Sequence, residues 1–300
     1  MISVVIVSFR SSAILVNCAD SVLAQLSEFD ELIVIENSGD KQLLQEPFVR
    51  DHRVSIKINP INQGYTVGCN QGLSLAGNDH VLLLNPDTVP QAGAFDQLKA
   101  HLSTKRSSVY CVELLNEDGS RQDYYRRFPS VRALLVMFFA PSGIQNHFSS
   151  YRHYTYFGEL DKKSAFQQPP GAGLVVSKNH RLDEDFFVYG SDLQFCWEIF
   201  QKNHLPIEML PAKFYHARGQ GGTASSTELA DALRVESAKA FALYYKKTGQ
   251  NRRHVAWNLF YILFEIIGII KVGHSAVQRK QKTRRLIAFV FSEPWLEKIT

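Results

Sequence analysis

The chain has 300 residues, which is enough for one large domain or two modest ones. Hydrophobic residues make up 45% of it and charged residues 21%, a balance that supports a packed core and excludes a disordered chain. A net charge of +4 does not by itself indicate nucleic acid binding, and four scattered cysteines without a CxxC pair favour a reduced cytosolic compartment over a disulfide framework.

Strand and helix patterns alternate through the first part of the chain. The first apolar run is too short for a signal peptide and has no basic segment before it, so we expect a buried strand there. The expected elements are strands at 2–9, 31–37, 54–60 and 80–88 and helices at 11–26 and 65–76. Such a βαβ series predicts a parallel α/β sheet with right-handed crossovers.

Polar residues end these strands, and ligands bind beyond the carboxyl ends of strands in such sheets. The residues concerned are Ser8, Glu36, Asn37, Asn85 and Asp87. Asp87 in LLLNPDT (82–88) could hold Mg2+ or Mn2+, which prefer hard oxygen ligands and would neutralise charge on a nucleoside-diphosphate leaving group. Asn-Pro-Asp-Thr is also ordinary turn chemistry, so this segment alone leaves both interpretations open.

Glycines recur at a loop-to-helix junction in NQGYTVGCNQGL (62–73), where a helix N-terminus attracts phosphate. No Gly-Lys-Ser/Thr follows, so this is not a P-loop, and the turn after the first strand lacks the glycines of a dinucleotide fingerprint. Later elements expected are helices at 91–105 and 227–248, strands at 109–116 and 171–177, and a strand followed by a Gly-rich loop within 204–222.

The last part of the chain is apolar and basic. Residues 255–272 are apolar apart from Asn258, Glu265 and Lys271, and the stretch 246–285 holds ten Lys or Arg against one acid. A basic-flanked apolar helix suits insertion into an anionic membrane surface. The alternative is a helix packed on the domain with a solvated basic face.

Eight segments, in order over about residues 1–245, together resemble the family 2 glycosyltransferases, most closely their rhamnosyltransferase-like branch. They are SVVIVSF (3–9), IVIENSGD (33–40), NQGYTVGCNQG (62–72), LLLNPDT (82–88), NEDGSRQDYYRRFPS (116–130), PPGAGLVV (169–176), EDFFVYGSDLQFCW (184–197) and PAKFYHARGQGG (211–222). The resemblance implies a GT-A fold, a Rossmann-like and mostly parallel sheet with helices on both faces, and inverting transfer from a sugar nucleotide. It divides the chain into a nucleotide-sugar-binding half (1–105), an acceptor-binding and catalytic half (106–248) and a helical tail (249–300).

The resemblance also implies roles for individual residues. Asp192 would be the general base, and Asp87 would bind Mg2+ or Mn2+ with His216 beside the metal and diphosphate. Arg127 would lie on the acceptor or phosphate side. The residues implied in nucleotide-sugar binding are Ser8, Glu36, Asn37, Asn62, Gly64, Asn70, Asn85 and Arg127.

Two departures from the family pattern bear on the site. Glu36 stands where the family usually has Asp, and Ser191 with Asp192 replaces the usual Glu-Asp pair, with Gln194 in place of a later acid. Ser191 and Gln194 have the spacing of a capping box, which would put Asp192 at the first helical position, where the helix dipole favours its ionised form. Asp192 would then be ready to accept a proton; the alternative is that it only caps the helix.

We therefore expect an inverting, metal-dependent hexosyltransferase that moves rhamnose or another hexose to a glycan or lipid-linked acceptor in bacterial surface polysaccharide assembly. It would be cytoplasmic, peripheral to the inner face of the cell membrane, and would not bind nucleic acid. One alternative is a sugar nucleotidyltransferase, although SFRSSAIL lacks the Gly-rich, Arg-containing loop of that class. Another is a degenerate, non-catalytic membrane-associated relative.

Overall fold

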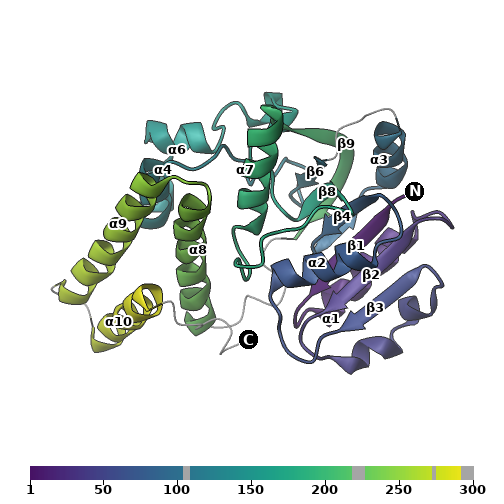
Figure 1. The fold of residues 1–300 in the computed structure, drawn as a ribbon, viewed down its shortest axis with the longest axis horizontal. Helices are drawn as coiled ribbons and strands as arrows, with labels where there is room; N and C mark the ends of the chain where they lie inside the picture. The colour runs from purple at the N-terminus through teal and green to yellow at the C-terminus, as the bar shows by residue number, and fades with distance from the viewer. Residues whose placement is uncertain (104–108, 218–226, 272–274, 292–300) are drawn as a thin grey trace.

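A mixed β-sheet with helices on both faces forms the first part of the molecule (Figure 1). The computed structural model describes residues 1–103, 109–217, 227–271 and 275–291. Its strands are β1 (Ser3–Ser8), β2 (Glu31–Glu36), β3 (Val54–Ile58), β4 (His80–Leu84), β5 (Thr88–Pro90), β6 (Val109–Leu115), β7 (Ala165–Phe166), β8 (Gly173–Ser177) and β9 (Ile207–His216). Their order across the sheet is β3-β2-β1-β4-β8-β6-β9-β5, and β7 pairs with β9.

Strands β3, β2, β1 and β4 are parallel neighbours, as the βαβ pattern predicts. Beyond them the sheet is mixed: β8 runs antiparallel to both β4 and β6, β5 and β7 run antiparallel to β9, and β6 runs parallel to β9. The expected strand 80–88 is in fact two strands. The chain leaves the sheet at Asn85-Pro86-Asp87, where proline has no amide hydrogen for a ladder, and Thr88 then pairs with His216.

Side chains alternate between two cores, one on each face of the sheet. On one face Val4 and Ile6 of β1 pack with helices α1 (Ser12–Leu23) and α3 (Ala94–Leu102). On the other, Val5 and Val7 pack with α2 (Tyr65–Leu75) and α7 (Ser191–Asn203). Two short 3-10 turns, η1 (Lys41–Gln45) and η2 (Pro47–Arg50), follow β2.

Helices form a third core beside the sheet. The long ones are α8 (Thr227–Lys247), α9 (Asn251–Ile270) and α10 (Ala276–Val290), which we call the helical unit. The pattern of the sequence did not predict the shorter ones, α4 (Val131–Phe139), α5 (Ser142–Gln145) and α6 (Ser149–Tyr154), or the 3-10 turn η3 (Leu160–Lys162). Figure 1 shows α7 between the sheet and the helical unit.

The third core crosses the expected boundary between 248 and 249, because α8 packs with α9 and α10. The division into three regions stays a prediction. The expected boundary at 105 and the Gly-rich residues after 217 lie outside the described residues.

Candidate active site

The carboxyl edge of the sheet gathers most of the residues singled out in the sequence. Ser8 and Glu36 end β1 and β2, Asn85 follows β4, and His216 ends β9. Because β8 is antiparallel to β4, its first residue, Gly173, pairs with Leu84 at the same edge. The edge is therefore built from five strands, and segments far apart in the chain meet there.

Glu36 is buried and shapes the turn that follows β2. Its carboxylate accepts hydrogen bonds from the backbone N–H of Ser38 (2.9 Å) and of Asp40 (2.8 Å), and from the Ser38 hydroxyl. The Ser8 hydroxyl, also buried, lies 2.8 Å from that of Ser11. Both side chains thus hold the loops at the edge in place.

Asn37 joins the end of β2 to the glycine-containing loop. Its Nδ2 donates to the carbonyl of Gly64 (2.9 Å), and its Oδ1 accepts from Asn59 Nδ2 (2.9 Å) and from the Gln63 N–H (3.2 Å). Asn62 Oδ1 in turn accepts from the Gly64 N–H at 2.9 Å. These amides form a wall whose polar groups are paired within the protein.

Gly64 is required in that wall by its surroundings. Its φ is +84°, and a Cβ there would lie 2.6 Å from the backbone oxygen and ring of Phe187. The Tyr65 N–H donates to the Phe187 carbonyl at 2.8 Å, so the loop is fixed to the segment that leads into α7.

Two residues implied in donor binding are occupied elsewhere. Asn70 makes three bonds with the segment before α7: Nδ2 donates to the Leu182 carbonyl (2.9 Å) and to Glu184 (2.8 Å), and Oδ1 accepts from the Leu182 N–H. Arg127 lies 3.8 Å above the ring of Tyr156 and donates to Glu159 (3.3 Å). Both positions are explained by packing, and their roles toward a ligand stay predictions.

Asp87 and His216 face each other across the β5–β9 pair. Both side chains are buried, and Asp87 Oδ1 lies 3.2 Å from His216 Nε2 without a hydrogen bond of regular geometry. Buried Gln122 holds the imidazole: its Nε2 donates to the His216 carbonyl (2.7 Å), which leaves its Oε1 to accept from His216 Nδ1 (2.8 Å). Nδ1 therefore carries a proton, and Nε2 is directed at the Asp87 carboxylate.

This pair fits a divalent cation in its donor atoms. A carboxylate oxygen and an imidazole nitrogen with lone pairs facing one position are metal ligands, and Mg2+ is commonly held by one or two carboxylates with phosphates and water completing the shell. Among the described residues no group of three His, Cys, Asp or Glu side chains has a metal-binding arrangement. Asp87 and His216 would need phosphate or water to complete the site.

Helix α7 begins in a way that corrects the predicted capping box. Gly190, with φ +91°, occupies the N-cap, so Ser191 and Asp192 are the first two helical residues, and no side chain caps the helix. Gln194 instead donates to Glu198 at 2.5 Å. A Cβ on Gly190 would lie 2.9 Å from Phe186 and 3.0 Å from Ala240, so tight packing places glycine at the cap and displaces serine from it.

Asp192 is half-buried and held by main-chain amides. Its Oδ2 accepts from the Gly171 N–H (3.2 Å) and its Oδ1 from the Leu193 N–H (2.8 Å). Burial raises the pKa of this carboxyl above its ordinary value, and the backbone hydrogen bonds from Leu193 and Gly171 oppose the rise without cancelling it. The amides at the helix terminus do favour the ionised form, as expected, but burial outweighs them. A carboxyl with a raised pKa is a better proton acceptor once ionised.

A chain of contacts links Asp192 to Asn85, which lies two residues before Asp87. The Asn85 N–H donates to the Ala172 carbonyl (3.3 Å), and Ala172 follows Gly171, whose N–H holds Asp192. A Cβ on Gly171 would lie 3.2 Å from that of Asp192, so the PPGAG segment passes directly against the acid. The two carboxylates thus share one edge, on either side of the start of β8.

Three site residues were missed in the sequence. Gln122 orients His216, Gly171 holds Asp192, and the Tyr65 hydroxyl donates to the Gly171 carbonyl at 3.2 Å. All three lie inside segments that carry the family resemblance, which is the only signal that could have drawn attention to them. No spacing marks them, because their partners are remote in the chain.

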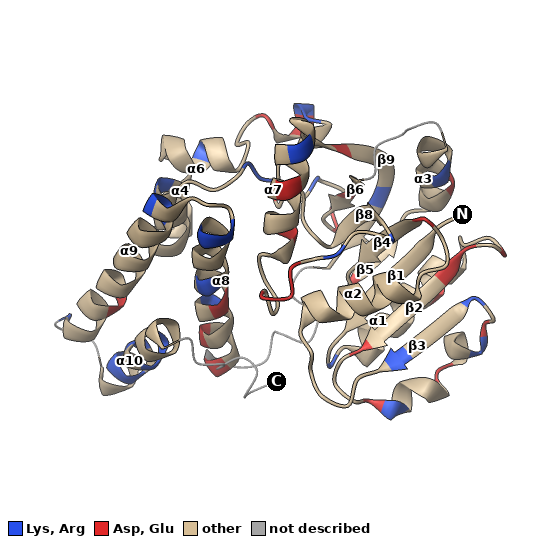
Figure 2. Cartoon of the chain, in the orientation of Figure 1, with Lys and Arg blue, Asp and Glu red and all other residues tan. Residues whose placement is uncertain are grey.

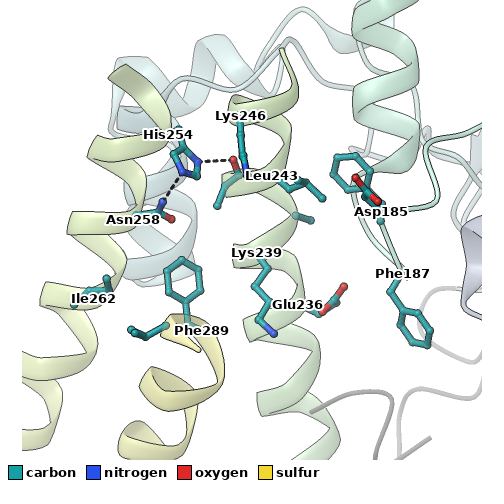
Figure 3. Close-up of a pocket in the computed structure, with 14 residues that line it drawn as sticks. Asp185, Phe187, Glu236, Lys239, Leu243, Lys246, His254, Asn258, Ile262 and Phe289 are labelled. Atoms are coloured by element: carbon teal, nitrogen blue, oxygen red, sulfur yellow. Dashed lines mark hydrogen bonds between the residues drawn. The ribbon is translucent and has the colours of Figure 1, made fainter. Parts of the chain in front are cut away.

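A cavity of about 480 Å³ lies away from this edge, between the helical unit and the segment Asp185–Phe187 (Figure 3). Lys239 and Lys246 of α8, His254 and Asn258 of α9 and Phe289 of α10 contribute to its lining. Its geometry does not include the two carboxylates, so we do not assign the chemistry to it.

Comparisons with known proteins agree with this fold. The sequence model described as glycosyl transferase family 2 matches residues 3–182. Glycosyltransferase GlyG of Streptococcus pneumoniae serotype 4 (strain ATCC BAA-334 / TIGR4) is 23% identical over 130 residues, which are 42% of this chain and 42% of GlyG. The chain therefore matches less than half of that relative's length.

Solved structures of S. aureus TarS are similar in fold. A TarS structure has a TM-score of 0.52 at 12% identity, covering 97% of this chain and 43% of TarS. TarS 1–349 in complex with UDP-GlcNAc has a TM-score of 0.55 at 13% identity, covering 98% of this chain and 81% of that one. At such identities the likeness shows the fold, which is that of GT-A glycosyltransferases.

Proposed function

The chain belongs to glycosyl transferase family 2, and we propose that it moves a hexose, rhamnose or another, from a nucleoside-diphosphate donor to a glycan or lipid-linked acceptor with inversion. The observation that carries the proposal is Asp192, a half-buried carboxyl with a raised pKa, held by main-chain amides at the carboxyl edge of the sheet. The complexes of TarS 1–349 with UDP and with UDP-GlcNAc support a sugar nucleotide as donor for this fold.

The donor would lie along the carboxyl edge between Glu36 and Asp87. Glu36, Asn37 and Gly64 hold the loops against which the nucleoside would pack. Asp87 and His216 would bind the Mg2+ or Mn2+, which would supply positive charge to the departing diphosphate. Gln122 keeps His216 Nε2 directed toward that position.

Asp192 would act on the acceptor. The acceptor oxygen forms a bond to the sugar C1 as the bond from C1 to the diphosphate oxygen breaks, and the acceptor proton passes to Asp192. One base on the face opposite the leaving group suffices, so no covalent sugar–enzyme intermediate is needed. Gly171 and Leu193 fix the direction of the carboxylate, and burial keeps its affinity for the proton high.

We also infer that the reaction takes place at the cytoplasmic face of a membrane, in surface polysaccharide assembly. The excess of Lys and Arg over acids in 246–285 supports an anionic surface as neighbour, and a lipid-linked acceptor would be found there.

The test combines donor binding with transfer. Thermal shifts of the whole chain with a panel of nucleoside diphosphates and their sugars, with and without Mn2+, should single out one nucleotide as the strongest stabiliser. Transfer from that donor to candidate acceptors should then fall about 10²–10⁴-fold in Asp192→Asn, while the thermal shift by the donor is kept. Glu198→Gln, on the same helix but exposed, is the matched control and should transfer normally. Full transfer by Asp192→Asn would show that another group takes the proton.

A further inference from the structure

Helix α9 has most of its large aliphatic side chains on its exposed side and a carboxylate on its buried side. Its buried stripe is Trp257, Tyr261, Glu265 and Gly268, with Glu265 at 0% exposure. Its exposed stripe, which we call the apolar ridge, consists of Val255, Leu259, Phe260, Leu263, Ile266, Ile267 and Ile270. Each ridge residue is 40–70% exposed, and no charged residue interrupts the ridge. A continuous apolar face of this size marks an interaction surface.

Glu265 fixes the opposite side of α9 to the protein. Its Oε2 accepts from Lys282 Nζ (3.5 Å) and from Arg285 Nη2 (3.3 Å), both on α10. Arg285 also bonds Asp231 of α8 at 2.6 Å, so one ion cluster joins all three helices. Trp257 adds a hydrogen bond to the Ala238 carbonyl at 2.9 Å. By length and composition α9 could cross a membrane, but crossing would separate Glu265 from these partners.

Basic residues surround the ridge. Exposed Arg252 and Arg253 precede it, exposed Lys271 follows it, and Arg279 and Lys280 of α10 are also exposed. Figure 2 shows Lys and Arg on α10. An anionic surface complements this charge. A second copy of the chain does not, because it would bring the same basic residues against one another.

We propose that the helical unit docks flat on an anionic lipid bilayer, with the apolar ridge inserted at the level between head groups and acyl chains and α9 in the plane of the interface. The basic residues at both ends of the ridge bind lipid phosphates. This goes beyond the proposed reaction by stating which surface binds the membrane and that α9 lies on it without spanning it. It does not depend on the identity of donor or acceptor.

Vesicle binding by the whole chain tests this surface. Wild-type protein should co-sediment with vesicles of phosphatidylcholine containing about one third phosphatidylglycerol, and less with phosphatidylcholine alone. The double variant Leu263→Glu/Ile267→Glu should lose at least about tenfold in binding, since each side chain contributes burial of its full apolar surface. Leu44→Glu/Leu205→Glu changes two exposed leucines outside the helical unit and is the matched control, expected to bind as wild type.

Three results would overturn the proposal. The first is vesicle binding by the ridge variant that equals that of the wild type. The second is bound protein that does not exchange to a second population of vesicles, which is the behaviour of a membrane-spanning helix. The third result is a wild type that sediments as a dimer and a ridge variant that sediments as a monomer, with equal vesicle binding by both. The ridge would then be a contact between two copies of the chain. Thermal stabilisation by the sugar nucleotide should be the same in ridge variant and wild type, so failure of the membrane surface is distinguishable from failure of the proposed reaction.

Discussion

Helix α7 and the helical unit each carry a buried or half-buried carboxylate, and the two carboxylates have different partners. In the helical unit Glu265 is fully buried, and two cationic side chains, Lys282 and Arg285, are directed at it. At the carboxyl edge of the sheet, the hydrogen bonds that Asp192 accepts from described residues come from the backbone N–H groups of Gly171 and Leu193. Among the described contacts, cationic side chains neutralise the charge of Glu265, whereas backbone amides fix the orientation of the Asp192 carboxylate.

The difference in partners distinguishes an acid that stabilises the fold from an acid suited to accept a proton. A buried carboxylate with cationic partners joins helices, and removing it leaves uncompensated charge. Asp192, whose pKa burial raises more than its backbone hydrogen bonds lower it, is suited to bind a proton. Replacing each acid by its amide should therefore have opposite effects on stability.

Glu265→Gln should show the larger effect. It leaves Lys282 and Arg285 beside a neutral group in a buried position, and breaking such a pair costs about 3 kcal/mol. Burial already lowers the pKa of Lys282, with Glu265 opposing the shift, so the loss of Glu265 should lower it further. Chemical denaturation measures the free energy of unfolding. A variant as stable as wild type would mean that the ion cluster does not join the helices.

Gln122→Met tests whether metal binding by Asp87 and His216 depends on the orientation of the His216 imidazole, which Gln122 fixes. Methionine keeps the volume of glutamine but cannot accept from His216 Nδ1. The ring loses its fixed orientation, and the affinity for Mn2+ in the presence of donor should fall about 10–100-fold. Isothermal titration measures it. Binding of the nucleotide without metal should be unchanged; a parallel loss there would indicate general disruption of the edge.

Asp192→Asn should become more stable relative to the wild type as the pH rises. The pKa of Asp192 is raised in the folded protein. Its contribution to the stability of the wild type is therefore fully present below the pKa of the unfolded chain, and it is lost as the pH rises through the pKa of the folded state. Asparagine does not titrate, so the difference in unfolding free energy between variant and wild type should grow as the pH rises above the ordinary pKa of an aspartate, about 4. A difference independent of pH would show that Asp192 is ionised as easily when folded as when unfolded.

Local features of the chain were predictable and remote ones were not. A buried apolar run followed by a polar residue placed the first two strand ends within one residue of Ser8 and Glu36, because both signals lie within a few residues. The reversal of β8 was not foreseen, since it depends on its partners β4 and β6 and not on its own sequence. The bond from Gln122 to His216 spans 94 positions, and no short-range pattern contains it.

The serine-to-glutamine spacing of a capping box shows how neighbours decide between equal local signals. Ser191 and Gln194 have it, as do Ser275 and Gln278, yet only the second pair forms the box, with Gln278 N–H to Ser275 Oγ at 3.2 Å and Ser275 N–H to Gln278 Oε1 at 2.8 Å. At α7 the glycine before the serine takes the cap, because Phe186 and Ala240 leave no room for a Cβ.

Ser275→Ala should therefore lower the unfolding free energy by about 1 kcal/mol, the usual loss for a removed helix cap. Ser191→Ala, the matched variant at the same spacing, removes no cap and should cost only about a few tenths of that. Denaturation of both variants in parallel measures the difference. Equal losses would mean that Ser191 caps α7 in solution. Asp192 would then be the first helical residue, as the capping-box pattern predicts.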